Sequence, residues 1–269
     1  MINISVIMVT KNEEVNIARS LPVAVKYFDE VFVVDSHSTD RTVEIAEKLG
    51  ATVRQFDWNG KYPKKRQWCL ENIKTKHDWV FMLDADEIVT DAFINELKRM
   101  SWKADGYFVK SDIVWKGKRL KYGMGNNKLC LFRRSVFHYP IVDDLDIGNL
   151  GEIEGHYQPV PTMPNMRIGQ IYNPLIHYNK KNNWVERHDK YAEWEIGMNE
   201  RNVWPLDPIF HRELVKDALR TARLRPYVFF IYGYILKGGF LHGKVGLDYA
   251  LKRFSYNRRI CRAARQTSD

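Results

Sequence analysis

Apolar runs of strand length alternate with helical stretches along the first part of the chain. Buried parallel strands are predicted where the apolar residues are continuous, at residues 4–9, 31–34 and 79–83. Helices are predicted between and after these runs, at residues 15–28, 42–49 and 64–73, with a weaker strand at residues 52–56. The alternation of strand and helix predicts an α/β fold built on a sheet of mainly parallel strands.

The pattern changes after residue 90. We expect a short helix at residues 91–100, strands at 106–115 and 128–132, a loop rich in Gly, Pro and acidic residues at 143–166, and a helix at 183–199. From residue 211 the chain is predicted to be helical and basic. We therefore expect a main domain of residues 1–210 and a helical, basic C-terminal extension of residues 211–269.

Composition indicates a folded protein. With 269 residues, 45% of them hydrophobic, the chain can bury a full core, which excludes a disordered protein. Cys69, Cys130 and Cys261 lie far apart and form no zinc pattern, so we expect reduced structural cysteines. Residues 1–10 are predicted to be a first strand and not a signal peptide. The longest apolar run, residues 226–236, is shorter than the about 20 residues that a membrane-spanning helix needs.

The positive charge is concentrated at one end of the chain. Residues 212–269 hold 13 Lys and Arg against 4 Asp and Glu, which equals the whole net charge of +9. Residues 220–240 interleave basic and aromatic side chains on an expected helix, a composition that suits the head-group layer of an anionic membrane. The same stretch also fits an oligomer contact or a helix packed on the core.

Three polar clusters follow predicted strands: residues 10–13 (TKNE), 35–38 (DSHS) and 84–87 (DADE). In open α/β sheets, ligands bind beyond the carboxyl ends of the strands. The loop after the first strand has neither of the glycine-rich patterns that cradle phosphates, which argues against a dinucleotide fold and a P-loop. Carboxylates repel a diphosphate unless a divalent cation lies between them. Asp84 and Asp86 therefore predict oxygen ligands for Mg²⁺ or Mn²⁺ and for a sugar hydroxyl.

The ordered set TKNEE, VVDSHSTDRT and DWVFMLDADE resembles the family 2 glycosyltransferases with the GT-A fold, most closely their lipopolysaccharide-core β-glucosyltransferase group. The resemblance is strong over residues 1–135. It implies a GT-A nucleotide-diphospho-sugar transferase fold and metal-dependent, inverting transfer from a UDP-sugar, with glucose as the first expectation. The implied acceptor is a lipopolysaccharide-core or lipid-linked glycan, reached from the cytoplasm at the inner face of the cytoplasmic membrane.

The resemblance also implies roles for individual residues. Thr10 and Glu13 would line the nucleoside pocket, and Asp35 would hydrogen-bond the uracil. Asp84 would contact the ribose or the donor sugar, and Asp86 would bind the metal.

Basic residues are also implied near the diphosphate. Lys65 and Arg66 match the group's basic pair, where cations favour the leaving group, although a solvated helix face is the alternative. His177 is either a third metal ligand or a packed or solvent-facing histidine.

The general base departs from the family pattern. The family commonly has an acidic residue after the next strand, often in a Val-His-Glu segment, whereas this chain has Val142, Asp143 and Asp144. Asp144 is the first candidate for the base, with Asp143 and Glu152 as alternatives.

Residues 187–195 (RHDKYAEWE) resemble a stretch of the lipopolysaccharide group, and the family's QxxRW motif is absent. At i,i+4 spacing, Arg187, Tyr191 and Glu195 share one helix face, which either meets the acceptor or diphosphate or is an ordinary polar face.

Two other classes of protein are weighed against this reading. A nucleotidyltransferase with the same type of sheet would need a glycine-rich loop after the first strand, and TKNEEVN has no glycine. A nucleic-acid-binding protein would spread its basic residues over the folded face, whereas here the surplus is confined to the tail. No nucleic-acid partner is therefore expected.

Overall fold

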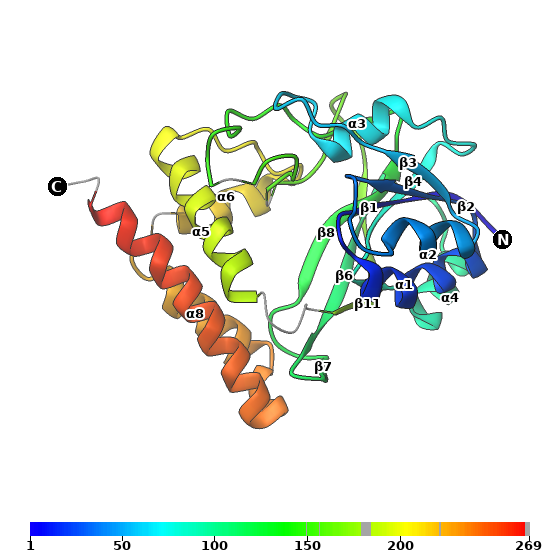
Figure 1. Ribbon diagram of the computed structural model, residues 1–269. Helices are drawn as coiled ribbons and strands as arrows, with labels where there is room; N and C mark the ends of the chain where they lie inside the picture. Colours follow the sequence, from blue (N-terminus) through cyan, green and yellow to red (C-terminus); the bar gives the residue numbers. More distant parts are fainter. Residues whose placement is uncertain (149, 156, 179–183, 221, 267–269) are drawn as a thin grey trace. The chain divides into compact units, whose positions relative to one another are not determined.

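The computed structural model describes residues 1–148, 150–155, 157–178, 184–220 and 222–266 (Figure 1). Contacts divide the chain into two compact units. Unit 1 comprises Met1–Ser111, Asn126–Tyr139 and Gln158–Tyr178. Unit 2 comprises Asp112–Gly125, Pro140–Tyr157 and Asn179–Asp269. The domain boundary expected after residue 210 stays a prediction.

The first half of the sheet in unit 1 is parallel. Its strands are β1 (Ile2–Thr10), β2 (Phe28–Asp35), β3 (Thr52–Gln55) and β4 (Trp79–Asp84), in the order β3-β2-β1-β4. The continuous apolar residues of β1 and β4 are buried because both faces of these strands are covered. The parallel register brings the ends of β1 and β2 together, with Thr10 opposite Asp35.

The second half of the sheet contains the antiparallel strand pairs. After β4 come β8 (Asn126–Arg133), β6 (Gly106–Trp115), β11 (Ile168–Tyr178) and β5 (Glu87–Ile88). The short strands β9 (Phe137–His138) and β10 (Val160–Pro161) pair separately. Two registers matter for the site: Phe81 pairs with Leu131 across β4 and β8, and Glu87 pairs with His177 across β5 and β11.

The helices of unit 1 are α1 (Glu14–Tyr27), α2 (Thr42–Lys48), α3 (Lys65–Asn72) and α4 (Asp91–Arg99). In Figure 1, α1, α2 and α4 lie on one face of the sheet and α3 on the other. Gly50, with a positive φ of 85°, ends the turn after α2, and the Thr90 hydroxyl caps α4 by accepting from the Phe93 amide at 3.2 Å.

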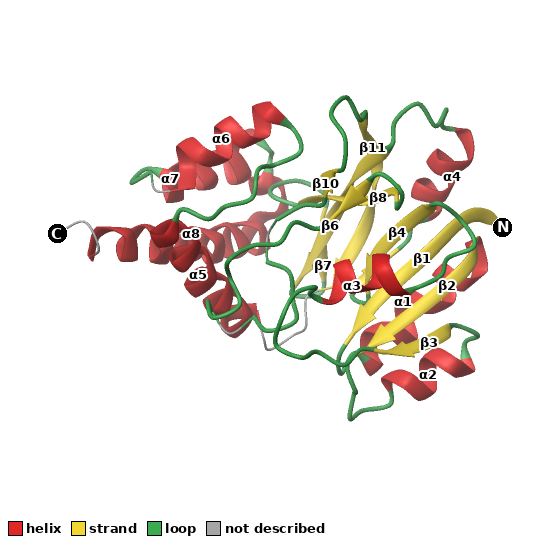
Figure 2. Ribbon diagram, turned by 90° about the horizontal axis from the view of Figure 1, so that it is seen from above, coloured by secondary structure: helices red, strands yellow, loops and turns green. Residues whose placement is uncertain are grey.

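Unit 2 is mainly helical, as Figure 2 shows in red. Its elements are β7 (Lys118–Leu120), α5 (Trp184–Arg201), α6 (Phe210–Arg220), α7 (Arg225–Phe230), the π-helix η1 (Ile231–Leu236), the 3₁₀-helix η2 (Gly239–His242) and α8 (Gly243–Gln266). An aromatic cluster holds Trp115, Trp184 and Tyr249 together, with Trp115 edge-on to Trp184 at 5.6 Å between ring centroids. Among the described residues, no helix is both long and apolar enough to span a bilayer.

A buried ion pair joins three helices of unit 2. Glu195 on α5 accepts from Arg225 Nη2 at 2.5 Å and from the Tyr256 hydroxyl, and Arg225 Nε donates to Asn257 at 2.8 Å. Burial raises the pKa of the Tyr256 phenol and the Glu195 charge raises it further, so the hydroxyl stays protonated and donates. The ion pair therefore ties α5 to α7 and α8.

Most predicted elements of unit 1 are confirmed, with small shifts at their ends. The loop at residues 143–166 is irregular apart from β10, and the helix expected from Asn183 is α5, with Asn183 itself outside the described residues. The expectation of one helix over residues 220–240 is wrong. The chain there forms α7, η1 and η2, and Gly238 breaks the run with a φ of 70°.

We predict that Glu195→Ala destabilises the protein by about 3 kcal/mol or more, because it leaves the Arg225 guanidinium buried without its counter-charge. Urea unfolding monitored by circular dichroism measures the effect. Glu186→Ala, an exposed change on the same helix, is the matched control and should cost less than about 0.5 kcal/mol. Equal losses in the two variants would contradict the role of this ion pair.

Candidate active site

The adjacent ends of β1 and β2 hold the first predicted site residues. Thr10 Oγ1 donates to Asp35 Oδ1 at 2.8 Å, and Ser38 donates to Asp35 through its amide at 2.7 Å and its hydroxyl at 2.5 Å. Asp35 is fully buried. These bonds fix its orientation, and a carboxylate has about four lone-pair sites, so Asp35 retains capacity to accept from a ligand.

Glu13 lies in the loop that follows Thr10. Its carboxylate accepts from Asn16 Nδ2 at 2.7 Å, and its amide donates to the Thr42 hydroxyl at 2.8 Å. The residue precedes α1 and is half-buried. Its contacts tie the loop to the starts of α1 and α2, beside the strand ends.

Lys65 brings a positive charge to the same strand ends. The residue begins α3 and is only 5% exposed, so it does not belong to a solvated helix face. Its ammonium donates to the Thr10 carbonyl and the Ser36 hydroxyl, both at 2.6 Å. Lys65, Thr10 and Asp35 therefore form one polar cluster across β1, β2 and α3.

The carboxylate of Asp84 lies between two cations. Arg66 Nη2 contacts Asp84 Oδ1 at 2.9 Å, and Lys128 on β8 contacts Asp84 Oδ2. Lys128 also contacts Glu87 Oε2 at 2.7 Å, while Ser111 donates to Glu87 Oε1 at 2.8 Å. The site thus pairs two carboxylates with two cations, of which Glu87 is fully buried and the other three are half-buried.

The charges of this network hold one another in the ionised state. Burial alone raises the pKa of Asp84, but the nearby Lys128 and Arg66 outweigh it and lower the pKa far below its usual range. Burial likewise lowers the pKa of Lys128, and the Asp84 and Glu87 carboxylates more than reverse that effect. Asp84 is therefore an ionised, fixed hydrogen-bond acceptor.

Asp86 and His177 form the second part of this site. Their Oδ2 and Nε2 atoms are 3.6 Å apart, and His177 Nδ1 lies 3.7 Å from Glu87 Oε1. His177 Nδ1 is buried and makes no hydrogen bond to the described residues. Burial lowers the pKa of His177, but the charges of Asp86 and Glu87 raise it by more.

This pair fits a divalent cation. A separation of 3.6 Å is too long for a hydrogen bond. Neighbouring ligands of an octahedral ion at about 2.1 Å lie about 3.0 Å apart, so the two side chains would have to approach each other by a few tenths of an ångström to share one ion. Within the described ranges, no group of three or more His, Cys, Asp or Glu side chains is placed to hold a metal. Mg²⁺ is usually held by one or two protein groups and completed by substrate phosphates and water, so a two-residue site suffices.

Sequence reasoning missed Lys128 and Glu87. Glu87 directly follows Asp84, Ala85 and Asp86, and this position could have indicated that it belongs to the site. Lys128 precedes the apolar run 129–132, and only the antiparallel register of β8 against β4 brings it to Asp84.

The predicted base, Asp144, belongs to unit 2. It is 1% exposed, and its Oδ2 accepts from the Trp194 indole at 2.9 Å. A Cβ on Gly155 would lie 2.4 Å from the ring of that indole, and a Cβ on Gly148 would lie 2.8 Å from the Trp194 backbone nitrogen and Cβ, so only glycine fits at either position. Asp143, in contrast, is exposed and lies 3.6 Å from Arg201. The loop therefore fixes Asp144 and leaves Asp143 at the surface.

The three residues expected on one face of α5 differ in their surroundings. Glu195 is buried in the ion pair with Arg225, whereas Arg187 and Tyr191 are half-buried. An acceptor or diphosphate contact of Arg187 and Tyr191 stays a prediction, as do the roles of Asp144 and Glu152.

Comparisons with known proteins identify the family of the chain and its fold. Residues 5–139, half of the chain, match the family model described as glycosyl transferase family 2. An uncharacterized glycosyltransferase of Rickettsia typhi is 32% identical over 167 residues, 56% of this chain and 56% of that relative. One of Rickettsia conorii is 41% identical over 95 residues, 35% of this chain and 33% of the relative. The chain thus matches about half of the first relative's length and a third of the second's.

A mannosyltransferase of Pyrobaculum calidifontis, whose structure was solved with GDP-Man and Mn²⁺, aligns with a TM-score of 0.53 and 17% identity over 98% of this chain and 86% of that one. At this identity the likeness concerns the fold, which confirms the expected GT-A-like α/β architecture. With the family model matching half of its residues, the chain belongs to the family 2 glycosyl transferases.

Proposed function

We propose that this chain transfers a sugar from a nucleotide-diphospho-sugar to an acceptor hydroxyl. The observation that carries the proposal is the half-buried cluster in which Asp84 is fixed by Arg66 and Lys128, beside the Asp86–His177 pair. A fixed, ionised carboxylate suits recognition of sugar or ribose hydroxyls. UDP-glucose is the donor that we propose first.

Residues at the strand ends would bind the nucleotide. Asp35, held by Thr10 and Ser38, has remaining capacity to accept from the uracil ring, with Glu13 beside it. Lys65 and Arg66 would place positive charge near the diphosphate and so stabilise the charge that develops on the leaving group.

Asp86 and His177 would hold the divalent cation. Bound Mg²⁺ or Mn²⁺ supplies Lewis-acid neutralisation of the diphosphate as it leaves. The carboxylate of Asp86 and the imidazole of His177, which must lose its proton to bind the cation, would be the two protein ligands.

We propose Asp144 as the general base for an inverting displacement. Such a displacement needs one carboxylate to take the acceptor proton and no covalent nucleophile. The indole of Trp194 orients Asp144 by its hydrogen bond. For the acceptor we propose a lipopolysaccharide-core or lipid-linked glycan at the inner face of the cytoplasmic membrane.

Asp86→Asn should lower turnover by at least about 10²-fold, because the negative charge that develops on the diphosphate is no longer neutralised by a cation bound to Asp86. UDP release with and without EDTA measures this, and UDP-glucose should raise the melting temperature only with Mn²⁺ or Mg²⁺ present. Asp57→Asn, at a carboxylate that is 85% exposed, is the control and should leave turnover unchanged. Full activity in EDTA would overturn the metal assignment.

Lys128→Met should weaken UDP-glucose binding by about tenfold or more, because Asp84 loses the cation that fixes it and Glu87 is left buried without its partner. Titration calorimetry measures the affinity. Lys128→Arg preserves the charge and should retain most of the affinity. An unchanged affinity in a folded Lys128→Met variant would contradict a positioning role.

Asp144→Asn should lower the rate of sugar transfer by about 10²-fold or more, while the affinity for UDP-glucose stays close to that of the wild type. The amide oxygen of Asn can still accept from Trp194, so the loop should keep its structure. Asp143→Asn and Glu152→Gln are the comparison variants. If one of them loses transfer and Asp144→Asn does not, the base is that other residue.

A further inference from the structure

Unit 2 has an apolar surface that remains exposed in the folded chain. Six large side chains of α7 and η1 are between 41% and 72% exposed: Tyr227, Val228, Ile231, Tyr232, Ile235 and Leu236. Phe240 and Leu241 of η2 follow, at 50% and 59%. A contiguous exposed apolar face of this kind marks a contact with another molecule or with a membrane.

The spacing of these side chains defines one face. They occur as the pairs 227/228, 231/232 and 235/236, so successive pairs are four residues apart and share one side of the helix. The π-helical turn continues that helix, closed by a bond from the Lys237 amide to the Tyr232 carbonyl at 2.8 Å. We call these six side chains the α7–η1 face.

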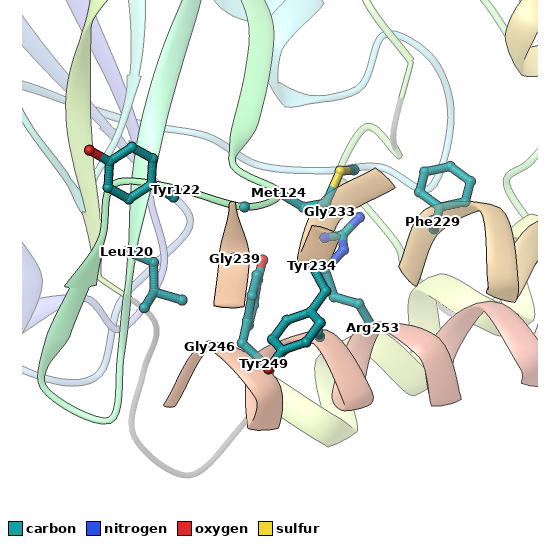
Figure 3. A pocket seen from close by; sticks show the side chains of 12 residues that line it. Leu120, Tyr122, Met124, Phe229, Gly233, Tyr234, Gly239, Gly246, Tyr249 and Arg253 are labelled. Atoms are coloured by element: carbon teal, nitrogen blue, oxygen red, sulfur yellow. The ribbon is translucent and has the colours of Figure 1, made fainter. Parts of the chain in front are cut away.

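A row of glycines fixes the backbone around the π-helical turn. A Cβ on Gly239 would lie 2.8 Å from the Gly233 carbonyl, and a Cβ on Gly246 would lie 2.1 Å from the Gly239 carbonyl. Only glycine fits there, so η1, η2 and α8 touch through their backbones. Figure 3 shows the small pocket at this contact, which Met124 from the loop between β7 and β8 also lines. Backbone fills the inner side of the turn, and the bulky side chains of the face are left outside.

The charged residues of the segment that contains the face are all basic. Residues 218–247 contain five Lys and Arg and no Asp or Glu. Arg223, Lys237 and Lys244 are exposed and lie before, at the end of and after the face in sequence. A second copy of this chain would bring the same positive charges to a shared contact, which disfavours self-association. An apolar layer bordered by negative head groups complements both the face and its charges.

We propose that the α7–η1 face inserts shallowly into an anionic lipid bilayer, with Arg223, Lys237 and Lys244 on the head-group phosphates. α7 and η1 have six residues each, a length of about 18 Å, so the segment would lie along the interface. Tyr227 and Tyr232 suit that layer, where amphipathic rings are enriched. This inference rests on the proposed function in one respect: the reason for binding the bilayer would be access to a lipid-linked acceptor.

The test is co-sedimentation of the full chain with vesicles of phosphatidylcholine, with or without about 30% phosphatidylglycerol, and without sugar donor or acceptor. Wild type should bind the anionic vesicles, and I235S/L236S should lower the bound-to-free ratio by at least about tenfold. K237Q/K244Q should remove most of the preference for anionic lipid. Raising NaCl from about 0.05 M to about 0.5 M should weaken wild-type binding.

L214S/V215S is the matched control, since these α6 side chains are 53% and 60% exposed and lie outside the face. It should bind vesicles as wild type does, and circular dichroism should show every variant folded. Equal binding to neutral and anionic vesicles, or an equal loss in the control, would overturn the proposal. So would a wild type that ignores vesicles but forms a dimer that I235S/L236S abolishes in light scattering.

UDP release with a soluble sugar acceptor separates this proposal from the proposed function. I235S/L236S should release UDP at the wild-type rate. Vesicle binding that persists in a protein with no transfer activity would support the bilayer surface and refute the glycosyltransfer. Transfer by a protein that binds no vesicles would do the reverse.

Discussion

The ion pair between Lys128 and Asp84 is the interaction on which the site in unit 1 depends. A carboxylate at the end of a buried strand is costly unless a counter-charge lies beside it. Lys128 supplies that charge to both Asp84 and Glu87, and Arg66 adds a second cation on the other oxygen of Asp84. The cluster is balanced before any ligand binds. Since each carboxylate oxygen has two lone pairs, a sugar hydroxyl can be accepted without breaking these ion pairs.

The sequence predicts the half of the site that follows from chain order. Thr10, Asp35 and Asp84 come directly after strong apolar runs, and parallel strands place their carboxyl ends at one edge. The partners on β8 and β11 depend on antiparallel registers between segments far apart in sequence. Lys128 meets Asp84 across 44 residues, and His177 meets Glu87 because β5 pairs with β11. The sequence pattern does not predict β11, since Asn173 and Pro174 are typical of a turn.

The helices of unit 2 show a second limit of prediction from the sequence. The i,i+4 spacing of Arg187, Tyr191 and Glu195 is that of a polar helix face, yet Glu195 is buried. Its partners Arg225 and Tyr256 lie 30 and 61 residues away, and no local pattern indicates them. The Gly238–Gly239 pair is typical of a turn, and it marks the place where the helical run ends. Local patterns thus predicted helix content, and long-range charge pairing decided which face is inside.

The apolar face and the basic residues of unit 2 have different physical consequences, and only their combination gives selective, reversible binding. Burying one exposed aliphatic side chain contributes about 1.5–3 kcal/mol, nearly independent of salt and of head-group charge. Each Lys or Arg near an anionic leaflet contributes about 1 kcal/mol, which salt weakens. Apolar contacts alone would bind any bilayer, and charges alone would bind any polyanion weakly. The core around Trp115, Trp184 and Tyr249 is separate from the exposed side chains of η1, so unit 2 can present that face without relying on it to fold.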